Sequence, residues 1–100
     1  MNGRVALEPF EMQEVCRLLG AIAPGVPVWA HGSRVAGCPR RTSDLDLAVE
    51  VADRDVRIVE ALREAFDESN LPFRVDVVAF DWLPLGSREA IRSQGVRIAG

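Results

Sequence analysis

The amino-acid sequence predicts an α/β fold, with a small mixed β-sheet of three or more strands flanked by helices. Helix-type and strand-type periodicities alternate along the chain, which is the pattern of an α/β protein. The chain has 100 residues, of which 48% are hydrophobic, enough for one core. No internal repeat, low-complexity tract or linker interrupts it, so we expect residues 1–100 to form a single domain.

The N-terminal part predicts a helix followed by a short buried strand. Residues 7–22 begin with acidic side chains and Pro9, which suit the first turns of a helix. An apolar stripe follows at roughly helical spacing: Phe10, Val15, Leu18, Leu19 and Ile22. Two prolines and a glycine in 23–27 end this helix. Residues 26–30 then predict a buried strand that stops at Gly32.

The rest of the chain predicts two further strands and two helices. Residues 44–51 alternate at strand spacing, which puts four aliphatic side chains on one face: Leu45, Leu47, Val49 and Val51. A helix over 54–68, capped by Asp53, has the apolar face Val56, Val59, Leu62, Ala65 and Phe66. The valine-rich segment 73–80 predicts the third strand, and 83–94 a last short helix.

Composition excludes several classes of function. A net charge of −3 argues against direct binding of nucleic acid or acidic membranes. All basic side chains are arginine, so no lysine is available for a Walker-type loop or a Schiff base. Cys16, Cys38 and the single His31 do not have the spacing of a zinc site. Because neither a signal peptide nor a long apolar run is present, we expect a cytoplasmic protein.

Two aspartates stand one residue apart at the start of the second predicted strand. Asp44 and Asp46 leave the same face, with Cα atoms roughly 6–7 Å apart. Two carboxylates at this spacing suit hard divalent cations such as Mg²⁺. Without a cation they repel each other, and one pKa rises. Solvated aspartates at a strand end are equally compatible with this pattern alone.

A third aspartate lies on the valine-rich strand. Asp76 stands between Val75 and Val77, in what we expect to be a central strand. A carboxylate there is unfavourable unless it is paired or bound to a metal ion. Arg74 lies on the same face, so an ion pair between Arg74 and Asp76 is the alternative to metal binding.

A Gly-Ser pair follows the first predicted strand. Gly32 allows the backbone to approach a ligand closely. If Ser33 opens a helical turn over 33–36, free N–H groups and the hydroxyl can hold a phosphate there. An ordinary turn is the alternative. Three arginines of the same loop either add positive charge near this turn or are simply solvated: Arg34, Arg40 and Arg41.

Together these features resemble the minimal nucleotidyltransferases of the DNA polymerase beta-like superfamily. The segment "GSRVAGCPRRTSDLDLAV" is similar to that family's Gly-Ser pair, ten-residue spacer and Asp-x-Asp signature, and Asp76 is similar to its third acid. The tail "REAIRSQGVRI" is similar to its closing helix and Gly-Val segment, although no aromatic residue follows. The resemblance covers about residues 26–98 and implies a nucleotidyltransferase core.

The resemblance also implies the roles of the site residues. The nucleotide-binding residues would be Gly32, Ser33 and Arg34, and the catalytic and metal-binding residues would be Asp44, Asp46 and Asp76. Two Mg²⁺ ions would lie on these carboxylates, and Asp76 would help to deprotonate the attacking hydroxyl. The reaction would be in-line transfer of a nucleoside monophosphate, with pyrophosphate leaving.

Minimal nucleotidyltransferases of this kind are similar to the antitoxins of HEPN/MNT toxin–antitoxin modules. The resemblance implies transfer of AMP from ATP to a tyrosine of a HEPN-type toxin, within a homo- or hetero-oligomer. The chain contains no tyrosine, so it does not modify a tyrosine of its own. Two alternatives stay open, a non-catalytic binding antitoxin and a small-molecule nucleotidyltransferase. His31, beside the Gly-Ser pair, either packs in the core or reaches the triphosphate.

Overall fold

The structure, a computed structural model, describes residues 5–36, 44–52 and 56–100. Within these residues the elements are, in chain order, α1 Pro9–Ile22, β1 Val28–His31, α2 Ser33–Ala36, β2 Leu45–Val49, α3 Arg57–Asp67, β3 Val75–Ala79, the 3₁₀ helix η1 Phe80–Trp82, α4 Leu85–Gln94 and β4 Val96–Ala99. Every predicted helix and strand is therefore present, with ends displaced by a few residues. The structure also has a short fourth strand, β4, which the sequence did not predict separately. The proposed cap Asp53 lies outside the described residues.

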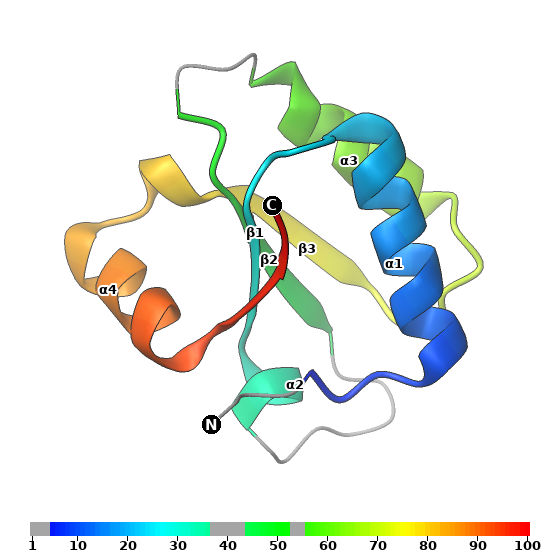
Figure 1. Cartoon of the computed structure of the whole chain (residues 1–100), viewed down its shortest axis with the longest axis horizontal. Coiled ribbons are helices and arrows are strands. Elements are labelled where there is room, and N and C mark those ends of the chain that lie inside the picture. Colours follow the sequence, from blue (N-terminus) through cyan, green and yellow to red (C-terminus); the bar gives the residue numbers. More distant parts are fainter. Residues whose placement is uncertain (1–4, 37–43, 53–55) are drawn as a thin grey trace.

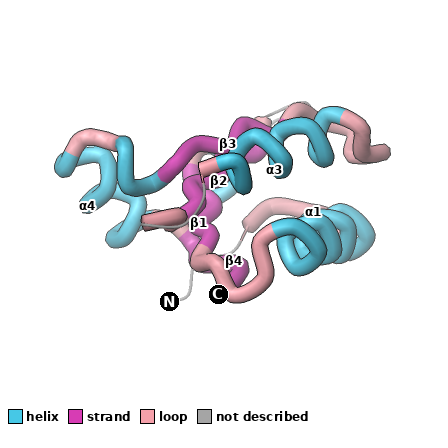
Figure 2. The backbone as a smooth tube through the Cα atoms, turned by 90° about the horizontal axis from the view of Figure 1, so that it is seen from above, coloured by secondary structure: helices cyan, strands magenta, loops and turns pink. Residues whose placement is uncertain are grey.

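The strands form one mixed sheet in the order β3-β2-β1-β4 (Figure 1). β1 is antiparallel to both of its neighbours, β2 and β4, whereas β2 and β3 are parallel. Figure 2 shows α1 and α3 on one side of this sheet and α4 on the other. The small mixed sheet flanked by helices is thus confirmed. None of the described helices has the length and apolar character needed to cross a membrane.

The main core lies between the sheet and the helices α1 and α3. The four aliphatic residues predicted to share one face of the second strand are completely buried here: Leu45, Leu47, Val49 and Val51. The helices contribute Val15, Leu18, Leu19, Val59, Leu62 and Phe66. Phe10 and Val56, predicted for the apolar faces, are instead 59% and 42% exposed. Both residues lie at the N-terminal end of their helix. Periodicity predicts which side of a helix faces the core, but it does not predict where along the helix the packing against the sheet begins.

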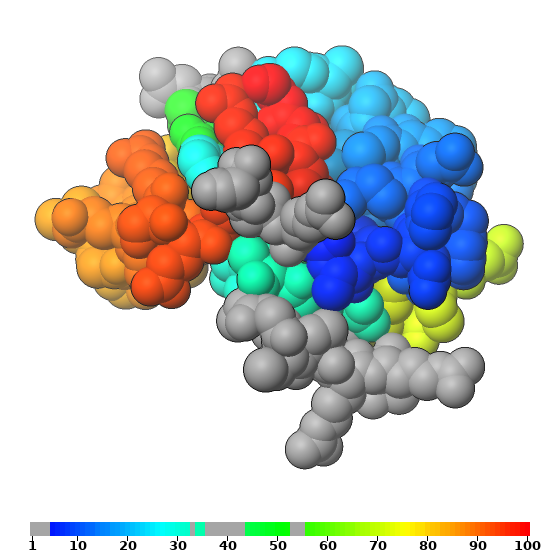
Figure 3. Space-filling model, turned by 60° about the horizontal axis from the view of Figure 1, so that its bottom comes forward, coloured from blue at the N-terminus to red at the C-terminus, as the bar shows by residue number. Residues whose placement is uncertain are grey.

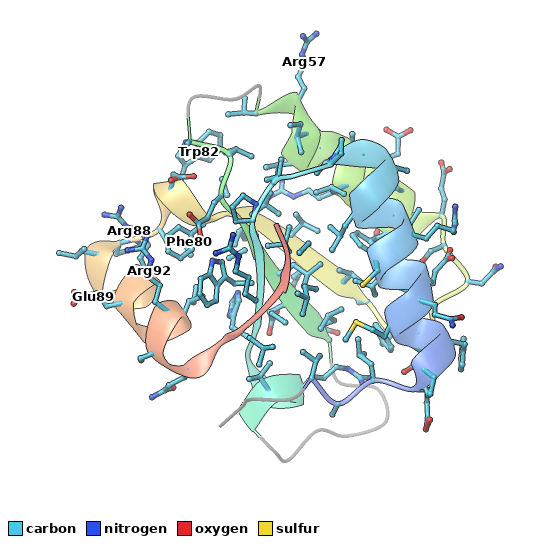
Figure 4. The ribbon with its side chains drawn as sticks, viewed as in Figure 1. Arg57, Phe80, Trp82, Arg88, Glu89 and Arg92 are labelled. Carbon is cyan, nitrogen blue, oxygen red and sulfur yellow. The ribbon has the colours of Figure 1, made fainter. Side chains whose placement is uncertain are left out.

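The opposite face of the sheet carries a smaller core under α4. Trp29, Ala48 and Val78 are register partners on β1, β2 and β3, so their side chains form one row. Ile91 of α4 and Phe80 pack on this row. The guanidinium of Arg92 lies over the ring of Phe80, 5.0 Å from its centre (Figure 4). Burial of this apolar row attaches α4 to the sheet.

The position of β3 corrects one expectation from the sequence. Asp76 was predicted to lie on a central strand, but β3 is an edge strand that pairs only with β2 among the described strands. Valine spacing reports that one face of a strand is buried, here by α3, and carries no information on how many strands lie beside it. The Asp76 side chain is accordingly 46% exposed.

The core makes a direct prediction for stability. Leu47→Ala leaves a cavity at a completely buried position, so we expect the free energy of unfolding to fall by about 2–5 kcal/mol. The matched control is Leu85→Ala, because Leu85 is 62% exposed and its loss should change stability by less than about 0.5 kcal/mol. Urea denaturation followed by circular dichroism measures both. Equal losses for the two variants would contradict the assigned core.

Candidate active site

Three polar side chains form a row across the uncovered part of the sheet face that α4 packs on. Asp46 on β2 is the register partner of His31 on β1 and of Asp76 on β3. Register partners on neighbouring strands point to the same face and lie close together. This polar row is the next same-face row after the apolar row of Trp29, Ala48 and Val78. All three of its side chains remain partly exposed.

The carboxylates of this region repel one another. Burial raises the pKa of Asp46, and the negative charges of Asp76 and Asp44 raise it further, while His31 acts in the opposite direction. Asp44 is exposed and immediately precedes β2. The negative charges of three carboxylates therefore act together at Asp46, and this favours the binding of a cation there.

The carboxylates do not converge on one point. In the part of the chain that the structure describes, no three His, Cys, Asp or Glu side chains form a ready-made metal site. Magnesium does not require one, since it is usually held by one or two carboxylates together with water and substrate phosphates. The donor set of oxygen atoms on Asp44, Asp46 and Asp76 fits that chemistry.

The Gly-Ser turn lies directly against Asp46. Gly32 has a φ of +86°, and a β-carbon at this position would lie 2.2 Å from Oδ2 of Asp46. A residue with a side chain would be strained at this φ, and its β-carbon would displace the carboxylate of Asp46. The helix α2 begins at Ser33, as predicted, and the N–H of Val35 donates to the carbonyl of Gly32 at 3.0 Å. The structure thus brings the Gly-Ser turn against Asp46 of the Asp-x-Asp pair.

Arg34 has a packing role that the sequence did not indicate. Its guanidinium donates to the carbonyl of Ala6 at 2.7 Å and lies 4.1 Å from the ring centre of Phe73. Its side chain is buried, and its own carbonyl accepts from the N–H of Ala6. These contacts tie the N-terminal segment and the chain before β3 to α2. The nucleotide-binding role of Arg34 stays a prediction, and Arg40 and Arg41 lie outside the described residues.

The alternative partner of Asp76 is present but weak. Nε of Arg74 lies 3.5 Å from Oδ1 of Asp76, and the two side chains are 73% and 46% exposed. Exposed pairs of this kind contribute about 0–1 kcal/mol. The ion pair therefore adds little stability, and at this exposed edge position Asp76 does not need it.

His31 is a functional candidate that the sequence left without a role. Its Nε2 atom is buried and has no hydrogen-bond partner among the described residues. Burial lowers the pKa of His31, although Asp46 acts against this, so the neutral imidazole dominates at pH 7. A neutral ring can either donate or accept at Nε2.

Two comparisons with known proteins relate to this site. The chain is 42% identical over 85 residues to the probable protein adenylyltransferase MntA of Haemophilus influenzae, covering 82% of this chain and 73% of that protein. The fold is similar to a crystal structure of a toxin–antitoxin with AMP-PNP, with a TM-score of 0.71 and 26% identity over 89% of this chain and 73% of the other. No family model matches the sequence.

Gly32→Ala tests the contact with Asp46. We expect it to destabilise the protein more than Gly25→Ala, because Gly25 shares a positive φ, at +75°, but has no atom near the added β-carbon. The backbone strain alone costs about 1–2 kcal/mol. Thermal unfolding compares the two variants. Equal losses would show that the Asp46 contact adds nothing at position 32.

Arg74→Ala tests the weight of the ion pair with Asp76. Because the Arg74 side chain is largely exposed and that of Asp76 partly exposed, we expect the free energy of unfolding to change by less than about 1 kcal/mol. Arg17→Ala, which breaks the exposed Arg17–Glu14 pair at 2.8 Å, provides the comparison in the same denaturation assay. A loss of several kcal/mol for Arg74→Ala alone would instead give Asp76 a structural role.

Proposed function

The chain belongs to the family of MntA-type protein adenylyltransferases, and we propose that it transfers AMP from ATP to a partner toxin, for which it is the antitoxin. Membership makes the chain a nucleotidyltransferase. The observation that carries the proposal is the direct approach of Gly32 to the Asp46 carboxylate, with Asp76 beside it. This approach supports a site in which the turn binds phosphate and the acidic side chains reach the same nucleotide.

We assign metal binding to Asp44, Asp46 and Asp76. Their oxygen atoms match the ligand preference of Mg²⁺, and their mutual repulsion would be relieved by positive charge. Two bound ions would neutralise phosphate charge and activate the attacking oxygen. Asp76, on the exposed edge strand, is also proposed to accept the proton of the acceptor hydroxyl.

We assign the terminal phosphates to the turn at Gly32 and Ser33. The free N–H groups at the start of α2 are donors for phosphate oxygens. Since Gly32 lies against Asp46, phosphates on this turn would also lie beside the carboxylates. The protein's contribution to the rate would then be positioning and charge stabilisation, with little covalent chemistry.

The proposed acceptor is a tyrosine hydroxyl of a helical HEPN-type toxin. The similar protein from Haemophilus influenzae is described as a protein adenylyltransferase, and the similar crystal structure is a toxin–antitoxin pair with an ATP analogue. The 100 residues of this chain contain no tyrosine. The acceptor tyrosine is therefore assigned to the partner protein.

A transfer assay tests this function. The chain is incubated with ATP labelled at the α-phosphate, Mg²⁺ and the protein encoded beside it. We expect label on the partner and none after removal of Mg²⁺ with EDTA. Asp46→Asn should lower labelling by at least about 100-fold, because it removes a charge that acts at the reacting phosphate. Glu64→Gln, an equal change of charge at an exposed site on α3, should leave labelling unchanged.

The same assay identifies the competing function. Unlabelled partner, together with undiminished complex formation by the Asp46→Asn variant, would contradict transfer and indicate an antitoxin that acts by binding alone. Circular dichroism of each variant establishes that it is folded before the comparison is made.

A further inference from the structure

The buried side chain of Arg34 joins α2 to two segments that lie far from it in the sequence. Its Nη1 atom donates to the carbonyl of Ala6 at 2.7 Å, and the N–H of Ala6 donates to the carbonyl of Arg34 at 2.8 Å. On the face drawn in Figure 3, the deep-blue surface at the start of the described chain borders the teal surface of α2. The guanidinium also lies over the ring of Phe73, 4.1 Å from its centre.

The helix α2 depends on such contacts for its position. It consists of only four residues, Ser33–Ala36, which make a single turn. Fixing the backbone of a first helical turn costs more free energy than its one hydrogen bond contributes, so an isolated turn is not stable. Val35 packs against the main core without a directional contact, whereas the contacts of Arg34 are directional. The free N–H groups at the start of α2 are therefore oriented largely through Arg34.

The contact with Phe73 also connects α2 to the strands that carry the aspartates. Phe73 directly precedes Arg74, whose carbonyl accepts from the N–H of Leu45 at 2.9 Å. Leu45 is the middle residue of the Asp-x-Asp pair. A continuous chain of contacts thus runs from the turn through Arg34 and Phe73 to the acidic pair, on a path separate from the direct approach of Gly32.

We propose that Arg34 is a positioning residue for the Gly32–Ser33 turn, an inference that rests on the proposed function. Arg34 holds the N–H donors of the turn at the distance from the carboxylates that a bound triphosphate requires. The side chain does not touch the nucleotide, because Arg34 is only 6% exposed and its guanidinium is already engaged by Ala6 and Phe73. This role replaces the direct contact with the nucleotide that the family resemblance implies.

The chemistry of arginine suits orientation better than filling of space. Burial of a guanidinium is unfavourable unless it is hydrogen-bonded, so an apolar side chain would fill the same volume more easily. The hydrogen bond to Ala6 weakens steeply when its angle changes, and attraction to the ring of Phe73 requires a position over its face. Together they define both the place and the orientation of α2. Such precision matters, since a displacement of about 1 Å can lower a rate by about 100-fold.

Variants on the two sides of the contact test the proposal. Arg34→Met keeps a long side chain but removes the guanidinium, and Phe73→Leu removes the ring but leaves the charge of Arg34 in place. Binding of inorganic tripolyphosphate with Mg²⁺ is measured by calorimetry, on protein that circular dichroism shows to be folded. We expect each variant to bind tripolyphosphate about tenfold more weakly, which corresponds to the loss of one hydrogen bond to a charged group.

Matched controls make the same changes at exposed positions of α1. Arg17 and Phe10 are 63% and 59% exposed, and we expect Arg17→Met and Phe10→Leu to leave tripolyphosphate binding unchanged. The double variant Arg34→Met/Phe73→Leu should bind no more weakly than the weaker single variant, because both changes break one contact. Losses that multiply in the double variant would overturn the proposal.

The kinetics of transfer distinguish positioning from a role in stability. We expect both single variants to raise the KM for ATP by about tenfold, whereas a role in stability alone would lower the unfolding temperature and leave this constant unchanged. Unaltered KM and unaltered tripolyphosphate binding in both folded variants would therefore overturn the proposal. Weakening by Arg34→Met together with an unaffected Phe73→Leu would overturn it in favour of direct phosphate binding by Arg34. If Arg34→Met does not fold, the milder Phe73→Leu decides by the same two measurements.

The outcomes also separate this inference from the proposed function. If the unaltered protein binds neither AMP-PNP nor tripolyphosphate, the proposed function fails and the positioning role fails with it. If the unaltered protein binds both and the variants of Arg34 and Phe73 bind them equally well, only the positioning role is wrong.

Discussion

The close approach of the Gly32 backbone to the Asp46 carboxylate is the constraint on which the rest of the site depends. It favours a residue without a side chain at a positive φ, and it lies at the end of the β1–β2 ladder, where His31 and Asp46 are register partners. The turn and the acidic pair are separated by ten residues in the sequence, yet they become one surface through this contact. A larger residue at position 32 would push the Asp46 carboxylate away from the turn.

Stability and function are divided between successive rows of one sheet face. The apolar row of Trp29, Ala48 and Val78 is covered through Ile91 and Phe80, and it holds α4 in place. The polar row of His31, Asp46 and Asp76 stays partly exposed, which keeps the repelling carboxylates hydrated. Full burial of that row would make its charges far less favourable. Because α4 covers only part of this sheet face, the apolar row is packed in a core while the polar row stays in contact with water.

The sequence predicted what depends on local pattern and missed what depends on distant contacts. Alternation in β2 predicted that Leu45 and Leu47 are buried and that Asp46 faces away from them, and the structure has this arrangement. The edge position of β3 was not predictable, because valine spacing carries no information on neighbouring strands. The packing of Arg34 on Ala6 and Phe73 depends on segments remote in sequence. The cavity of about 240 Å³ beside the Gly-Ser turn also depends on distant segments, since residues 31–35 and 90–95 line it.

The polar row also gives the proposed reaction a direction. With its phosphates on the turn at Gly32, the proposed nucleotide would lie at the His31 end of the row. Asp76 stands at the other end on an edge strand, where its carboxylate is 46% exposed. A hydroxyl carried by a large partner protein can reach an exposed sheet edge. The nucleotide and the partner protein would thus meet at Asp46 from opposite ends of the row.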